Sequence, residues 1–150
     1  TGFMQGDGID WTLAQTGDAN AWNIAGTMMD YSVMNFNVAG SRNDLSFNLG
    51  QITSAQYTTL TYNITGSDNV GTWNIDADGV TQTVNITGDY NTLSYTATGY
   101  GTSVDGHTLT ADVQGNNNAI TILQETTTAA SNININTVGS DQIIGITQSD

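Results

Sequence analysis

The chain has no cysteine and no proline among its 150 residues, and each absence excludes a class of structure. Without cysteine there is no disulfide framework, no thiolate metal site and no cysteine nucleophile. Without proline every residue keeps a backbone N–H, so no strand is broken by a missing donor. Stability must come from packing and hydrogen bonding along uninterrupted segments.

Charged residues are also scarce, at 10 %, and fourteen of the fifteen are acidic, which gives a net charge of −13. Such a chain repels nucleic-acid phosphates and anionic membranes, so neither is expected as a partner. No apolar run approaches the roughly 18 residues of a membrane span, and no membrane insertion is expected. The opening TGFMQGDG lacks the regions of a signal peptide, so an exported protein would be in its mature form.

What the sequence does contain is a repeat, in which a glycine is followed three residues later by an amide. The glycines are spaced by 23, 26, 22, 27 and 24 residues. Glycine permits positive φ and its neighbours favour turns, so each pair is predicted to form a tight corner. The six pairs are Gly17/Asn20, Gly40/Asn43, Gly66/Asn69, Gly88/Asn91, Gly115/Asn118 and Gly139/Gln142.

On both sides of each corner, apolar and polar residues alternate with a period of two. At offsets −6, −4, −2, +5, +7 and +9 from the glycine, 29 of 36 residues are apolar, against 9 of 36 at the offsets between them. The contrast assigns one buried face to each strand. The predicted core includes Trp11, Trp22, Phe36, Phe47, Tyr62, Trp73, Tyr95, Ile122, Ile135 and Ile146.

These patterns predict one all-β domain over residues 1–150, a β-solenoid of six strand-turn-strand units (β-arches) with cross-β stacking. Neither arm of a unit can bury its apolar side alone, whereas stacked units bury a continuous core. An antiparallel meander with ordinary turns is the alternative, but it does not demand the same glycine-amide pair at every second turn. The rungs are expected at about 9–26, 32–49, 58–75, 80–97, 107–124 and 131–148.

Stacking would superimpose the six corner amides. A carboxamide carries both donors and an acceptor, so these side chains are expected to hydrogen-bond to one another along the stack.

The pattern resembles the curlin repeat of bacterial curli subunits, Ser-x5-Gln-x-Gly-x-x-Asn-x-Ala-x3-Gln, over residues 9–148. The glycine matches in all six units and the asparagine in five; the leading serine matches at Ser32 and Ser131 and the final glutamine at Gln124 and Gln148. The first glutamine survives only as Gln15, and the alanine is absent. The resemblance implies a secreted functional amyloid that adds end to end by β-augmentation on a nucleator and forms biofilm matrix.

The periodicity alone also favours assembly, because the first and last rungs show no capping helix, charge cluster or proline. We expect a head-to-tail homopolymer. The resemblance to the curlin repeat further implies an extracellular or cell-surface filament that serves in matrix or adhesion, with a nucleator subunit and secretion machinery as further partners. The alternative is a β-solenoid that does not polymerise and acts as an adhesin, a carbohydrate-binding module or an ice-binding module. For ice binding, the relevant feature is the outward array of Thr and Asn at offsets −5 and −3. For sugars, it is Tyr31, Tyr57, Tyr90 and Tyr100 in loops or corners.

Catalysis finds little support in the sequence. The single histidine, His107, is expected in a loop beside Asp105, and no HExxH, GxSxG or phosphate-loop motif is present. We therefore expect neither an enzyme nor a cofactor. Calcium is the one metal with candidate ligands, but solvated turn carboxylates are the preferred interpretation of these acids. The candidates are Asp76 and Asp78 with the corner acids Asp18, Asp68, Asp89 and Asp141.

Overall fold

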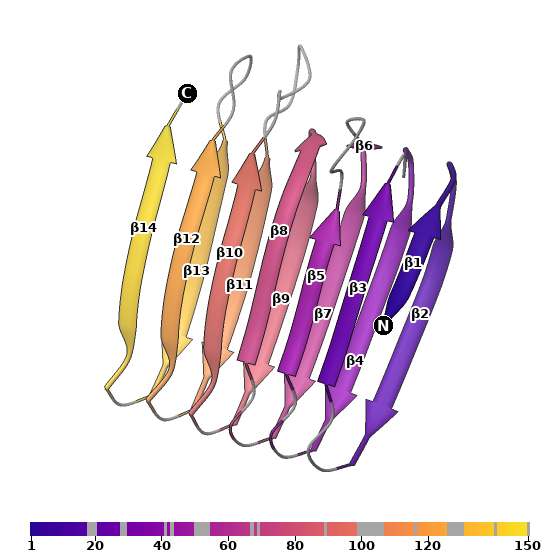
Figure 1. Cartoon of the computed structure of the whole chain (residues 1–150). Helices are drawn as coiled ribbons and strands as arrows, with labels where there is room; N and C mark the ends of the chain where they lie inside the picture. The colour runs from indigo at the N-terminus through magenta and orange to yellow at the C-terminus, as the bar shows by residue number, and fades with distance from the viewer. Residues whose placement is uncertain are drawn as a thin grey trace.

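The computed structural model shows an all-β chain whose strands form two parallel sheets that face each other (Figure 1). The fold is a β-solenoid, which confirms the expected fold class. The structure describes residues 1–17, 21–27, 30–40, 42, 44–49, 55–66, 68, 70–88, 90–98, 107–115, 117–125, 131–139 and 141–149.

The two sheets alternate along the chain, so that each corner joins a strand of one sheet to a strand of the other. Sheet A runs in the order β1 (Gly2–Gln5), β3 (Ala21–Thr27), β5 (Asp44–Leu49), β8 (Val70–Asp78), β10 (Thr92–Thr98), β12 (Ala119–Glu125) and β14 (Ile143–Ser149). The short β6 (Ala55–Gln56) pairs with the end of β8. Sheet B consists of β2 (Asp10–Thr16), β4 (Val33–Ala39), β7 (Thr59–Thr65), β9 (Thr81–Thr87), β11 (Thr108–Gln114) and β13 (Asn132–Val138).

The register of both sheets follows the distance of each residue from its corner glycine. In sheet B, the residues four before each glycine pair in one row: Leu13, Phe36, Tyr62, Val84, Ala111 and Ile135. In sheet A, the residues seven after it do the same: Ile24, Phe47, Trp73, Tyr95, Ile122 and Ile146. A shift by one residue would turn every apolar side chain to solvent, so burial itself fixes this register.

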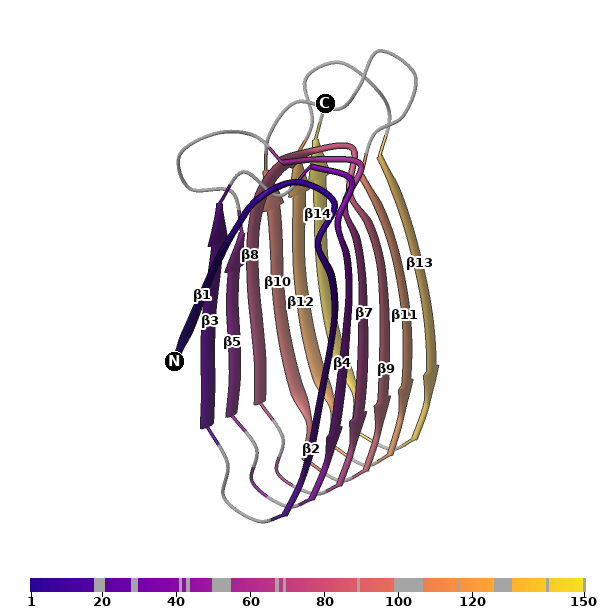
Figure 2. The same ribbon diagram turned by 90° about the vertical axis from the view of Figure 1, so that its right-hand side faces the viewer.

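The core is the single layer of side chains between the sheets. Figure 2 shows the ribbons of the two sheets facing each other across the space that this layer occupies. Phe36, Phe47, Tyr62, Trp73, Tyr95 and Ile122 are buried there, while Trp11, Trp22 and Ile135 pack against the same cluster at the ends and are partly buried. Full burial of an aliphatic or Phe side chain contributes about 1.5–3 kcal/mol relative to exposure, so the middle rungs carry most of the stabilisation.

Ile146, which the sequence places in the core, is 51 % exposed. It keeps the inward register, because it pairs with the buried Ile122 of β12. Its exposure results from its position in β14, the edge strand of sheet A in the described chain. The residue is therefore a core position that no further described strand covers.

Candidate assembly faces and polar ladders

The six corner glycines form a column that allows the rungs to stack closely. Their φ values lie between 134° and 151°, a conformation that side chains with a Cβ rarely adopt. A Cβ added to Gly66 would collide with the carbonyl oxygen of Gly40 in the rung before, and the four other glycines from Gly40 onward meet the same obstacle. The corner thus requires glycine for both its backbone angle and its spacing.

The described corner amides bond to the backbone rather than to each other. Asn91 donates from Nδ2 to the carbonyl of Gly88 at 2.7 Å, and Asn118 Oδ1 accepts from the backbone N–H of Asn91 at 3.2 Å. Gln142 donates from Nε2 to the carbonyl of Gly115 at 3.3 Å. These amides bond to backbone groups at the corners, and Nδ2 of Asn118 and Oδ1 of Asn91 have no hydrogen-bond partner, so the two side chains do not form the expected amide-to-amide ladder. Asn20, Asn43 and Asn69 lie outside the described residues.

An amide ladder does exist, but on the outer face of sheet B. Asn63 donates from Nδ2 to Oδ1 of Asn37, and Asn85 donates in the same way to Asn63, both at 2.8 Å. In the next rung the row meets Asp112, whose Oδ1 accepts from Nδ2 of Asn136 at 3.3 Å. The sequence predicts these residues as part of a flat outward array of polar side chains. Because many amide groups of this row bond to one another, fewer of them can bind water or a neighbouring molecule.

A second amide pair lies on the outer face of sheet A, where Asn74 donates from Nδ2 to Oδ1 of Asn48 at 2.9 Å. Both sets occur where asparagines recur at one offset in successive rungs. Outward side chains of paired parallel strands are close enough for amides to bond, as in cross-β ladders.

His107 directly precedes β11 and lies outside the strands, but its side chain is enclosed in the stack and not exposed in an open loop. Its side chain is buried, and Nδ1 accepts from the backbone N–H of Val80 at 3.4 Å. Its carbonyl accepts from Nε2 of the buried Gln124 at 3.1 Å. The residue occupies the offset of buried Ser32 and Thr58, eight before the corner glycine. A buried imidazole at this position links successive rungs and is not placed to meet a substrate. Asp105 lies outside the described residues.

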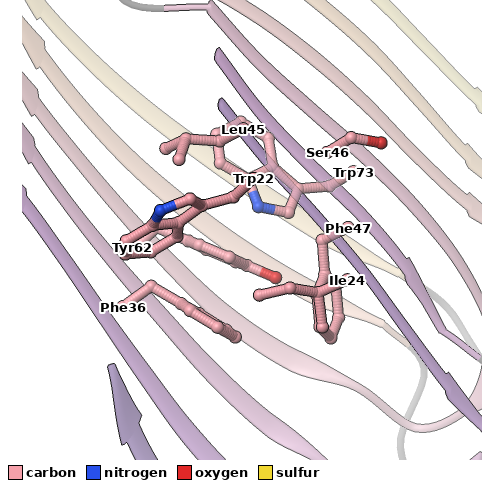
Figure 3. A pocket seen from close by; sticks show the side chains of 8 residues that line it. All are labelled: Trp22, Ile24, Phe36, Leu45, Ser46, Phe47, Tyr62 and Trp73. Atoms are coloured by element: carbon pink, nitrogen blue, oxygen red, sulfur yellow. The ribbon is translucent and has the colours of Figure 1, made fainter. Parts of the chain in front are cut away.

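A small cavity lies among the aromatic side chains of the first three rungs (Figure 3). Its volume of about 10 Å³ is at the lower limit for one water molecule, so it is too small to bind a ligand. The rings around it pack closely: Phe36 and Tyr62 stack with centroids 5.1 Å apart, and Tyr62 lies 4.6 Å from Trp73. The residues that line it are Trp22, Ile24, Phe36, Leu45, Ser46, Phe47, Tyr62 and Trp73.

Two tyrosine hydroxyls lie within this core without a hydrogen-bond partner, those of Tyr62 and Tyr95. Burial raises the pKa of Tyr62 well above its usual value, and repulsion from Tyr95 adds to the shift. Burial likewise raises the pKa of Tyr95. Both rings therefore stay neutral in the folded chain well beyond the pH at which an exposed tyrosine ionises.

The acids do not gather into a metal site in the described part of the chain, where no group of three or more His, Asp or Glu side chains could hold a metal ion. Asp68 makes an exposed ion pair with Arg42 at 3.4 Å, and Asp76 and Asp141 are exposed. Asp18 and Asp89 lie outside the described residues, as does the side chain of Asp78. Calcium binding stays untested.

Among the described residues, no helix is long and apolar enough to cross a membrane.

Tyr31 and Tyr57 lie side by side at equivalent turns, both at positive φ. Their rings stack with centroids 5.2 Å apart and stay 65 % and 47 % exposed. Tyr90 is exposed at a corner, and Tyr100 lies outside the described residues. The stacked pair is an exposed aromatic surface outside the core.

The C-terminal face is formed by β13 and β14, which are the last described strands of their sheets. Ile144 and Ile146 have the register of buried residues in β12, yet they are about half exposed. Ile133 and Ile135 of β13 lie beside them and are partly buried. This face presents an apolar row with unpaired backbone groups along both strands.

The N-terminal face is formed by β2 in sheet B and β1 in sheet A. It contains a hollow of about 210 Å³. Its apolar lining comes mainly from Trp11, Leu13 and Trp22, which are only partly buried. One face is therefore mainly aromatic and hollowed, while the other carries isoleucines at the same offsets from the corner glycine.

The fold places the chain in the class of β-solenoids built from repeated strand-corner-strand units. No family model, no curated protein and no solved structure matches it. The resemblance to the curlin repeat therefore stays a prediction, and the function has to be argued from the two end faces.

Proposed function

We propose that this protein is the structural subunit of a secreted extracellular fibre, and that it polymerises end to end by β-strand augmentation. The observation that carries the proposal is the pair of end faces, which expose apolar positions and unpaired strand edges in the described chain. An exposed flat strand edge is a template for pairing with another chain. We infer that a second copy of this chain pairs with the edge, because its strands carry inward side chains at the same offsets from the corner glycine.

Strand direction supports head-to-tail contact. Every sheet A pair and every sheet B pair in the described chain is parallel, so only the opposite end of a second copy continues both sheets with the same polarity. Such a contact joins two different surfaces. Unless the rotation between successive copies closes them into a ring, the contact propagates as a filament. Secretion, a nucleator and a role in matrix or adhesion rest on the curlin resemblance and are part of the same proposal.

Electron microscopy of the purified chain, with fibre diffraction, tests this function. Filaments with a spacing of about 4.8 Å along the axis are expected. Ile146→Asp should block growth, because it buries a charge in the contact, whereas Thr147→Asp on the outer side of the same strand should not. A wild-type chain that stays monomeric at high concentration would overturn the proposal, and so would equal growth of the two variants.

A second candidate is a monomeric solenoid that binds carbohydrate, and the exposed stack of Tyr31 and Tyr57 favours it. Sugars pack their apolar faces on exposed aromatic rings. The expected signs are a stable monomer and a change in tyrosine fluorescence on titration with oligosaccharides, which Tyr31→Ala abolishes. Filament formation without any such change would rule this candidate out.

A further inference from the structure

The two sheets end unevenly at the N-terminal face. The main path of sheet A begins with β1, which lies outside β3, whereas sheet B begins with β2, the partner of β3 across the corner. Sheet A thus extends one strand further than sheet B, and Figure 2 shows β1 beside β3 at the end marked N. At the C-terminal face the sheets end together, because β13 and β14 belong to one corner unit.

This difference prevents the two faces from matching as they stand. If β14 of one copy paired with β1 of the next, β13 and β2 would be separated by the width of a missing strand, about 4.8 Å beyond normal pairing. Both sheets continue at equal spacing only if β14 pairs with β3 while β13 pairs with β2. In that arrangement β14 takes the position beside β3 that β1 occupies.

β1 is a weak occupant of this place. Its four residues pair only with Ile24–Thr27, which leaves the first part of β3 uncovered on that side. Gly2 and Met4 take the inward positions, and Phe3 points outward with 65 % of its surface exposed. A strand this short contributes few ladder hydrogen bonds and little apolar burial.

β14 of a second copy would fill the place better. It has seven residues, and the register by offset sets Ile144 opposite Trp22 and Ile146 opposite Ile24. In sheet B the same docking sets Ile133 opposite Trp11 and Ile135 opposite Leu13. The half-exposed isoleucines and the hollow beside Trp22 would then be covered together.

We propose that β1 is a displaceable edge strand that occupies the docking site for β14 of another copy, so that each addition step exchanges one strand for the other. This inference rests on the proposed function. β1 then acts as a kinetic block: a free subunit shields its own sheet edge until the incoming end replaces the shield. Exchange of a short strand for a longer one gives growth its direction.

An engineered disulfide tests the exchange, because the chain contains no cysteine. Phe3 and Ala25 are paired residues on the outer side of β1 and β3, so Phe3→Cys with Ala25→Cys can lock β1 in place. The matched control is Ala25→Cys with Asn48→Cys, which links β3 to β5, a pair that no exchange separates. Both variants are purified as oxidised monomers, and growth is followed by light scattering before and after a reductant is added.

The locked variant should stay monomeric while oxidised and grow at the wild-type rate once reduced, and the control should grow in both states. Oxidised growth at the reduced rate would overturn the exchange but leave end-to-end assembly intact. If the wild-type and reduced chains never assemble, both the exchange and the proposed function fail.

A second pair of variants probes the same step without a crosslink. Met4 packs against the core from the inner side of β1, whereas Phe3 does not. Met4→Asp should loosen β1 and shorten the lag before growth several-fold, and Phe3→Asp, with the same added charge, should change the lag less. An unchanged or longer lag for Met4→Asp contradicts a blocking role for β1.

Discussion

Asn63 donates a hydrogen bond from Nδ2 to Oδ1 of Asn37 in the preceding rung, and the distance is 2.8 Å. Asn85 repeats this bond to Asn63, so the donor of each rung always points toward the rung before it. Asp112 stops the series, because a carboxylate has no N–H to donate to Asn85. Its Oδ1 instead accepts from Nδ2 of Asn136, so the row is interrupted between Asn85 and Asp112 and continues from Asp112 to Asn136.

The first prediction follows from this break. Asp112→Asn should restore a continuous row and raise the free energy of unfolding by about 1 kcal/mol, measured by urea denaturation of the monomer. Asp76→Asn removes the same charge from an exposed position outside the row and should stay within about 0.5 kcal/mol of wild type. Equal gains in the two variants would assign the effect to net charge alone.

Gln82 supplies a second prediction, because it lies in the core between Leu60 and Leu109 with only 1 % of its surface exposed. Neither atom of its carboxamide has a hydrogen-bond partner. Gln82→Leu should raise the free energy of unfolding by about 1–3 kcal/mol, because it removes buried polar groups and continues an apolar row.

The control for Gln82 is Gln124, another buried glutamine. Its Nε2 donates to the carbonyls of His107 and Asn132 at 3.1 and 3.2 Å. Gln124→Leu should therefore lower stability, since it leaves those carbonyls without this donor. A loss of stability in Gln82→Leu would show that its amide is satisfied in solution.

The third prediction concerns the corner column. Gly66→Ala forces a Cβ against the carbonyl of Gly40 at a φ of 134°, and should cost at least about 2 kcal/mol of unfolding free energy. Gly145 of β14 has no atom within 4 Å of an added Cβ, so Gly145→Ala should change stability by less than about 0.5 kcal/mol. Similar melting curves for both variants would mean that the corners relax freely.

The fourth prediction is a loss of stability at high pH. The folded pKa values of Tyr62 and Tyr95 lie above the unfolded value of 10.0, so above that pH the unfolded chain binds fewer protons than the folded one. Their contribution is complete below pH 10 and is lost as the pH rises, by about 1.4 kcal/mol per pH unit for each tyrosine. Urea midpoints recorded from neutral to strongly alkaline pH measure this slope.

The matched variant for the alkaline effect is Tyr62→Phe with Tyr95→Phe. Neither hydroxyl has a hydrogen-bond partner, so the double replacement removes the ionisable groups without breaking a bond. Its midpoints should fall much less steeply above pH 10. A slope equal to that of wild type would place the alkaline transition elsewhere, for example on general charge repulsion.

The sequence was sufficient to predict the solenoid because side-chain alternation and register both depend on the distance from the corner glycine. Leu13, Phe36 and Tyr62 have the same offset, and they pair in the structure. The buried position of His107 could have been found in the same way, since it stands at the offset of Ser32 and Thr58.

The hydrogen bonds and the strand ends were harder to predict. An amide at a corner can reach either a neighbouring amide or a corner carbonyl, and only coordinates show that Asn91 chooses the carbonyl of Gly88. β1 has four residues, too few for a clear alternation, so its pairing with β3 left no recognisable pattern. Exposure of Ile146 depends on what covers the last rung, which local sequence does not encode.

Disulfide capture inside filaments tests the head-to-tail contact most directly. Thr12 of β2 and Asn134 of β13 are exposed, share one offset and lie at opposite edges of sheet B, about 24 Å apart within one copy. Oxidised filaments of the double variant Thr12→Cys/Asn134→Cys should give a ladder of covalent oligomers on a non-reducing gel, while each single variant gives none. Filaments that yield no ladder, or single variants that yield dimers, would contradict the account.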